Sequence, residues 1–169
     1  FRSMQGQVDG VFGFVNTIRF SAKLMGVEDG QLRYINYGDY GMDLYSNAII
    51  VSKKLVKENP KAVAGLIRAI NRGLIDSLKD LDASVAAVAK REPLIKVPVE
   101  KERFIATLKD EMNHPEIAKI GLGNVDPARL KKSIDILVEA NNLPRTPTVE
   151  EIFTPAFIPD AKDLPKKLF

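Results

Sequence analysis

The sequence predicts an α/β fold in which helices outnumber strands, and two observations support this class. Two short apolar runs, residues 8–15 and 44–52, have the length and the Val, Ile and Phe content of buried strands. From Lys53 almost to the C-terminus, apolar residues recur instead at helical spacing. A lone pair of strands is only marginally stable. We therefore expect further strands beside this pair, from a partner chain or, as we favour, from an N-terminal portion that this chain lacks.

The first third of the chain alternates short elements with breaks. The run at residues 8–15 ends at a polar pair, and residues 18–25 then follow with helical spacing. Gly26 is a typical residue for closing such a helix. We expect a short strand at residues 32–36, before the glycine-rich turn at residues 38–41.

Prolines and polar caps divide the helical part that follows. In Asn59-Pro60 the asparagine suits an N-cap and the proline suits the first helical turn, and Asp126-Pro127 repeats the arrangement. We expect helices at residues 53–58, 60–78, 83–90, 99–112 and 128–141, and one helical turn near residues 149–153.

Composition excludes several classes of function. The net charge is +3, from 25 basic and 22 acidic residues, and it is too small and scattered to indicate a nucleic-acid partner. The chain has no cysteine and one histidine, His114, so neither a thiolate metal site nor a histidine cluster is available. No phosphate loop or nucleophile elbow is visible. We expect a binding protein without a cofactor, and no enzyme.

Several segments, in the same order along the chain, resemble ABC-transporter substrate-binding proteins of the nitrate/sulfonate/taurine type. That group includes relatives that bind thiamine-pyrimidine precursors. The segments are GQVDGVFGF at residues 6–14, Gly26-Val27, YGDYG at residues 37–41, YSNAIIV at residues 45–51, ENP at residues 58–60, Glu102-Arg103-Phe104 and Phe153-Thr154-Pro155. The resemblance covers nearly the whole chain, although no one segment is specific alone.

The resemblance implies the C-terminal part of a type II periplasmic-binding-protein fold. Such proteins have two α/β lobes and close them on a small ligand in the cleft between them. By this analogy residues 1–36 are the end of the second lobe and residues 37–43 are the hinge crossing. Residues 44–169 then return to the first lobe and add the C-terminal helices and tail. The implied partners are a small polar or anionic organic ligand and a membrane permease, and the implied location is periplasmic or extracellular.

The first group of candidate ligand residues lies where the first apolar run ends. Phe14 offers an apolar wall, and Asn16 and Thr17 offer hydrogen-bonding groups, because strand ends of α/β folds often carry binding sites. The alternatives are that Phe14 is a core residue, as Phe12 is expected to be, and that Asn16 is a helix cap.

The second group lies in and after the crossing. Asp39 and Tyr40 are candidate ligand contacts, because a tyrosine combines a flat apolar face with a hydroxyl group. Asn47 is a polar residue within the second apolar run and is a further candidate. Tyr37, Gly38 and Gly41 are the candidate hinge residues. The alternative is a crossing that only packs on itself.

A second class of function stays open. The chain would then be a helical interaction module that a partner chain completes, or a homodimer that exchanges strands. Solution mass separates this hypothesis from solute binding.

Overall fold

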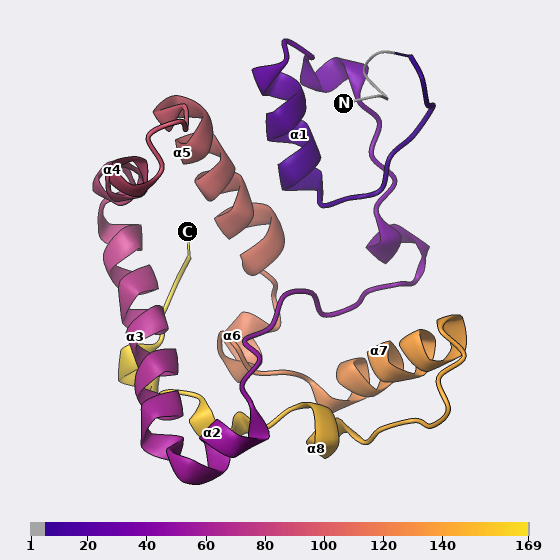
Figure 1. Cartoon of the computed structure of the whole chain (residues 1–169), viewed down its shortest axis with the longest axis vertical. Helices are drawn as coiled ribbons and strands as arrows, with labels where there is room; N and C mark the ends of the chain where they lie inside the picture. Colours follow the sequence, from indigo (N-terminus) through magenta and orange to yellow (C-terminus); the bar gives the residue numbers. More distant parts are fainter. Residues whose placement is uncertain (1–5, 169) are drawn as a thin grey trace. The chain divides into compact units, whose positions relative to one another are not determined.

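The computed structural model describes residues 6–168, and over this range it contains helices and no β-strand (Figure 1). The predicted α/β class, and with it the type II periplasmic-binding-protein fold, is therefore wrong for this structure. The predicted strands at residues 8–15, 32–36 and 44–52 do not form. A strand needs hydrogen bonds from a neighbouring strand, and no backbone amide of residues 45–51 donates to another backbone group of the described chain.

Eight α-helices are described within residues 6–168. They are α1 (Val15–Leu24), α2 (Lys53–Glu58), α3 (Pro60–Lys79), α4 (Leu81–Arg91), α5 (Val97–Ala106), α6 (Ile117–Ile120), α7 (Pro127–Ala140) and α8 (Val149–Ile152). The short 3-10 turns are η2 (Asp29–Gln31), η3 (Tyr37–Tyr40), η5 (Pro155–Phe157) and η6 (Ala161–Asp163), and η4 (Thr107–Met112) is a π-helical turn that continues α5.

The predicted helices after Lys53 are confirmed, with shifts of a few residues at some ends, and local capping marks the start of α2, α3, α7 and α8. The side chains of Ser52, Asn59, Asp126 and Thr148 each accept a hydrogen bond from a backbone amide in the first turn of the helix that follows. The helix predicted at residues 99–112 exists as α5 together with η4.

The chain forms two compact units. Within the described residues, the first unit holds residues 6–35 and 81–112, and the second holds residues 36–80 and 113–168. The predicted assignment of residues 1–36 to the end of a second lobe, residues 37–43 to a hinge crossing and residues 44–169 to a first lobe stays a prediction.

In the first unit, α5 packs against both α1 and α4. The buried apolar residues of the first unit are Phe20 and Ala22 of α1, Val85 of α4, and Ala106 and Leu108 of α5 and η4. Phe20 is the largest of these, at 2% exposed. This unit thus rests on a small apolar contact centred on one aromatic ring.

In the second unit, the long helix α3 packs against η5 and η6, and α7 packs against α8. Arg72 of α3 also forms an ion pair with the buried Asp163 of η6, with 2.7 Å between Nε and Oδ1. Val63, Leu130, Ile134 and Leu168 are its buried apolar residues. The apolar run at residues 44–52 stays outside this core, since residues 46–50 are all exposed.

Candidate functional site

The first group of candidate residues surrounds the start of α1. Phe14 is the N-cap residue, with extended backbone angles (φ −71°, ψ 134°), and no side chain caps this end. The first intrahelical bond runs from the amide of Ile18 to the carbonyl of Phe14 at 3.0 Å. The amides of Val15, Asn16 and Thr17 therefore have no acceptor within the helix. With no acidic residue in this turn, these amides favour a negatively charged or hydrogen-bond-accepting group.

Phe14 and Thr17 face outward at this helix start. Both side chains belong to exposed residues, so the ring offers an apolar face and the hydroxyl offers a hydrogen-bonding group to solvent. The prediction of Phe12 as a core residue is wrong, because Phe12 is 90% exposed. The alternative in which Phe14 is a core residue is likewise wrong.

Asn16 lies on the other side of α1 and is 5% exposed. Its Nδ2 donates to Oγ1 of Thr107 in the π-helical turn η4 at 3.3 Å, whereas its Oδ1 is buried and has no partner among the described residues. Asn16 does not cap α1, which excludes the capping alternative. A buried polar atom without a partner is costly, so Asn16 Oδ1 is the candidate atom in this unit with the most to gain from a new partner.

The contact between α1 and α5 continues one turn further along both helices. The guanidinium groups of Arg19 and Arg103 lie 5.5 Å and 5.8 Å from the centre of the Phe20 ring, which is within cation–π range. Lys23 forms an ion pair with Glu102 at the far end. We call the contact made by Asn16 and Phe20 with Thr107 and Arg103 the α1–α5 seam.

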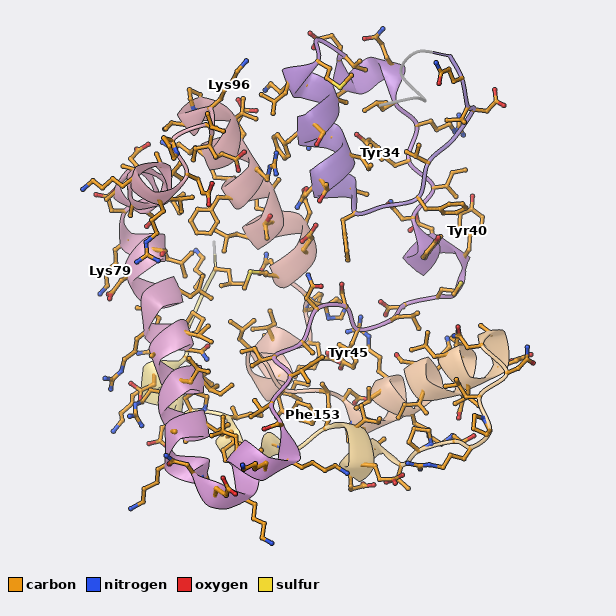
Figure 2. All side chains as sticks on the ribbon, in the orientation of Figure 1. Tyr34, Tyr40, Tyr45, Lys79, Lys96 and Phe153 are labelled. Atoms are coloured by element: carbon orange, nitrogen blue, oxygen red, sulfur yellow. The ribbon has the colours of Figure 1, made fainter. Side chains whose placement is uncertain are left out.

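A half-buried tyrosine, Tyr34, interacts electrostatically with Arg19 of the same helix, and its hydroxyl oxygen is buried. Burial raises the pKa of the Tyr34 hydroxyl group, Asp29 raises it further, and Arg19 lowers it in part. Arg19 is itself paired with Asp29, with 2.6 Å between Nη2 and Oδ2, and this pairing raises the pKa of the guanidinium group. Figure 2 labels Tyr34, whose hydroxyl oxygen has no partner among residues 6–168.

The second group of candidates lies in the second unit, on η3 and just after it. Tyr40 is 74% exposed (Figure 2). Tyr37 and Asp39 are exposed as well. Gly41 closes the turn in the left-handed conformation (φ 86°), which a side chain would strain. The amide of Met42 then donates to the carbonyl of Tyr37 at 3.0 Å. The aromatic rings are thus presented to solvent on a short, tightly closed turn.

Asn47 stays a predicted ligand contact. It is exposed within residues 46–50 and makes no hydrogen bond with the described part of the chain. Gly38, a candidate hinge residue, accepts a bond from the amide of Gly41 at 3.3 Å. The structure therefore places Phe14 and Thr17 on the exposed side of the start of α1 and Asn16 on its buried side, and it separately groups Tyr37, Gly38, Asp39, Tyr40 and Gly41 in one turn.

The second unit also contains a polar cluster that the sequence did not indicate. The Tyr45 hydroxyl donates to Oε2 of Glu116 at 2.6 Å and accepts from the amide of Asp126 at 2.7 Å. Arg129 donates to Glu116 at 3.1 Å and to Asp43 at 2.7 Å, and its guanidinium carbon lies 4.3 Å from the centre of the Tyr45 ring. We call these five residues the Tyr45 cluster.

The electrostatics of the Tyr45 cluster follow from this geometry. Burial raises the pKa of Tyr45, and the hydrogen bond to Glu116 raises it further because it holds the phenolic proton in place. Burial works against the charge of Arg129, but Asp43 and Glu116 more than offset it, so the pKa of Arg129 is raised. The cluster is therefore a neutral tyrosine and a charged arginine between carboxylates.

The described residues offer no sign of metal chemistry. No group of three or more His, Asp or Glu side chains within residues 6–168 is placed to hold a metal ion. His114, the one histidine, is exposed and its Nδ1 accepts a hydrogen bond from the amide of Glu116 at 3.2 Å. It serves a local turn before α6.

The comparison with protein families bears on the N-terminal half of the chain. Residues 2–84 match the family described as NMT1/THI5 like. The match covers just under half of the 169 residues and agrees with the family that the resemblance indicates. Proteins of this family are typically periplasmic substrate-binding components of ABC transporters and generally not enzymes, although THI5 itself is a thiamine pyrimidine synthase.

Two further comparisons gave no relatives. Neither the curated proteins nor the solved structures include a significant match to this chain. Among residues 6–168, no helix combines the length and the apolar character needed to cross a membrane.

Proposed function

We propose that this chain is part of the solute-binding component of an ABC uptake transporter and that it captures a small polar or anionic organic ligand. One observation carries the proposal: the family match at residues 2–84 spans both groups of candidate ligand residues and the whole crossing. The permease of the transporter would be its protein partner, and its place would be the periplasm or the cell exterior.

The ligand contacts in the first unit would come from the start of α1. Its free amides and the exposed Thr17 hydroxyl suit an anionic or carbonyl oxygen, and the exposed Phe14 ring suits the apolar part of the ligand. The unpaired Asn16 Oδ1 would accept a hydrogen bond from a ligand that enters the α1–α5 seam. A ligand with both an acceptor and a donor group fits this set of atoms.

The contacts in the second unit would come from η3 and the segment after it. Tyr40 and Asp39 are exposed and offer a flat ring and a carboxylate, with Asn47 as a further amide. Tyr37, Gly38 and Gly41 would absorb the change in backbone torsions on binding, and the left-handed Gly41 is suited to this.

Isothermal titration calorimetry tests the proposal with taurine, nitrate and a thiamine-pyrimidine precursor as probes. We expect one of them to bind, and we expect Thr17→Val to weaken it about threefold to tenfold, the value of one hydrogen bond. Thr146→Val is the matched control, since Thr146 is also exposed and lies outside the matched region. Absence of binding by all three probes would refute the proposed function, and an unchanged affinity of Thr17→Val would refute this site.

A helical interaction module is the second candidate function, and one observation favours it. Ile49 and Ile50 are exposed, Ile50 at 92%, on a segment whose backbone makes no internal hydrogen bonds. A strand from a second copy or from another chain would satisfy these groups. Light scattering after size exclusion decides: a monomer at micromolar concentration rejects the homodimer, and a dimer that dissociates on dilution supports it.

A further inference from the structure

Residues 42–52 connect η3 to α2, and we call them the strap. Within residues 45–51 no backbone amide or carbonyl takes part in a hydrogen bond with the described chain, and residues 46–50 are all exposed. The backbone of most of the strap thus makes no hydrogen bond that holds it against the rest of the second unit, and Leu44, Tyr45 and Val51 are its half-buried residues. Its attachment must come from the few residues that do make contacts.

Those contacts come from two side chains near one end of the strap. Asp43 pairs with Arg129 at the first turn of α7, and Tyr45 bonds to Glu116 before α6 and to the amide of Asp126. Both side chains reach Arg129: Asp43 forms an ion pair with it, and its guanidinium carbon lies 4.3 Å from the centre of the Tyr45 ring. Figure 2 shows Tyr45 beside α6 and the start of α7.

The residues to which the strap attaches are themselves held in place by α7 and by an ion pair. The side chain of Asp126 caps α7 by accepting from the amide of Arg129 at 2.8 Å, so Asp126 and Arg129 are fixed by their own helix. Glu116 has 17% of its side chain exposed and Arg129 has 18%, so their ion pair is shielded from solvent. The strap therefore attaches to partly buried polar residues that are held in place by other contacts.

We propose that the Tyr45 cluster is a latch: among the described residues it makes the hydrogen bonds and ion pairs that join the strap to α7 and to the residues before α6 and α7, and opening it releases residues 43–51 together. The latch also has a consequence for η3, which ends at the left-handed Gly41 directly before the strap. While the latch is closed, Asp43 is held in place by Arg129. Changes in the backbone torsions around η3 are then confined to residues 36–42. This inference does not depend on ligand binding and goes beyond the proposed function.

Limited proteolysis of the whole chain with thermolysin tests the latch. Thermolysin cleaves before large apolar residues, so Ile49, Ile50 and Val51 report on the strap and Leu66 and Ile70 report on α3. Cleavage of a segment follows the population in which that segment is free. We expect Tyr45→Phe, which keeps the ring and removes only the hydroxyl group, to speed strap cleavage about tenfold, the value of one charge-assisted hydrogen bond.

Two further variants complete the design. Tyr40→Phe is the matched control, because the Tyr40 side chain is exposed and makes no hydrogen bond, and we expect it to leave the cleavage rate unchanged. Asp43→Asn, at an exposed position of the strap, weakens the latch by removing the charge that pairs with Arg129, and we expect it to speed strap cleavage too. Far-UV circular dichroism checks that the helices are retained.

The possible outcomes separate the latch from a merely structural cluster. Faster cleavage at Ile49 and Ile50 with unchanged cleavage at Leu66 and Ile70 supports the latch. Unchanged strap cleavage in Tyr45→Phe and Asp43→Asn overturns it. Equal acceleration at the strap and at α3 overturns it as well, because the cluster would then only stabilise the unit as a whole.

Discussion

The α1–α5 seam and the Tyr45 cluster each join segments that are distant in the sequence, but they do so by different means. The seam is built around an apolar ring, Phe20, and leaves the polar atoms Asn16 Oδ1 and Arg103 Nε buried without partners. The Tyr45 cluster is built around a hydroxyl group that both donates and accepts, and only Arg129 Nε within it is unpaired.

This difference assigns the two regions different roles. Unpaired buried polar atoms cost stability, and such local costs are common where a protein has a function to perform. Among the described residues, the seam therefore keeps unpaired polar atoms, one of which the proposed function assigns to a ligand contact, whereas nearly all polar atoms of the Tyr45 cluster are paired. The predictions that follow alter each region and ask whether this contrast holds.

The largest effect is expected at the centre of the seam. Phe20→Ala removes the main buried ring of the first unit, and we expect a loss of about 3–5 kcal/mol in the free energy of unfolding. Urea denaturation followed by circular dichroism measures it. Phe12→Ala is the matched control, since Phe12 is 90% exposed, and it should change stability by less than about 0.5 kcal/mol. Equal effects of the two variants would show that the seam is not the core of this unit.

A smaller loss of stability is expected from a substitution in the Tyr45 cluster. Tyr45→Phe removes one of the two donors to Glu116 and leaves the amide of Asp126 without its acceptor, and we expect a loss of about 1–3 kcal/mol in the free energy of unfolding. Urea denaturation at neutral pH is again the measurement, with Tyr40→Phe as the control. No loss in Tyr45→Phe would mean that water replaces both bonds without cost.

The same residue predicts a dependence on alkaline pH. The pKa of Tyr45 is raised above its ordinary value of 10.0 in the folded chain, so the folded state favours the protonated phenol. Its contribution to stability is then fully present below about pH 10 and is lost as the pH rises through the raised pKa. We expect the wild type to lose stability over this range and Tyr45→Phe to lose less, as measured by urea denaturation at a series of pH values. Parallel curves for the two proteins would contradict this.

The helices after Lys53 were predictable because their signals are local. Asn59 and Asp126 cap helices through amides three residues away, and the apolar spacing lies within each helix. The strands were not predictable in the same way. Ile49 and Ile50 have the composition of a strand, but forming one requires a neighbouring strand, which no local pattern supplies.

In the candidate sites too, features set by neighbouring residues were predictable and contacts between distant residues were not. Phe14, Asn16 and Thr17 stand next to one another in the sequence, so their grouping at the start of α1 could be predicted, but the burial of Asn16 depends on Thr107, 91 residues away. The Tyr45 cluster joins residues 71 and 86 positions apart. Tyr, Glu and Arg at such separations carry no recognisable pattern, so only the structure reveals the cluster.

The smallest expected effect gives the sharpest test of the contrast between the two regions. Asn16→Ala removes the bond to Thr107, which costs about 0.5–1.5 kcal/mol, but it also removes the unpaired Oδ1, whose burial is unfavourable by about 1–3 kcal/mol. Alanine is also the better helix former at this position inside α1. We therefore expect the free energy of unfolding to stay unchanged or to rise slightly, while the affinity for whichever probe the wild type binds falls. A variant that loses stability as Tyr45→Phe does would place Asn16 among the groups that hold the chain together, and the seam would then differ from the cluster only in its apolar ring.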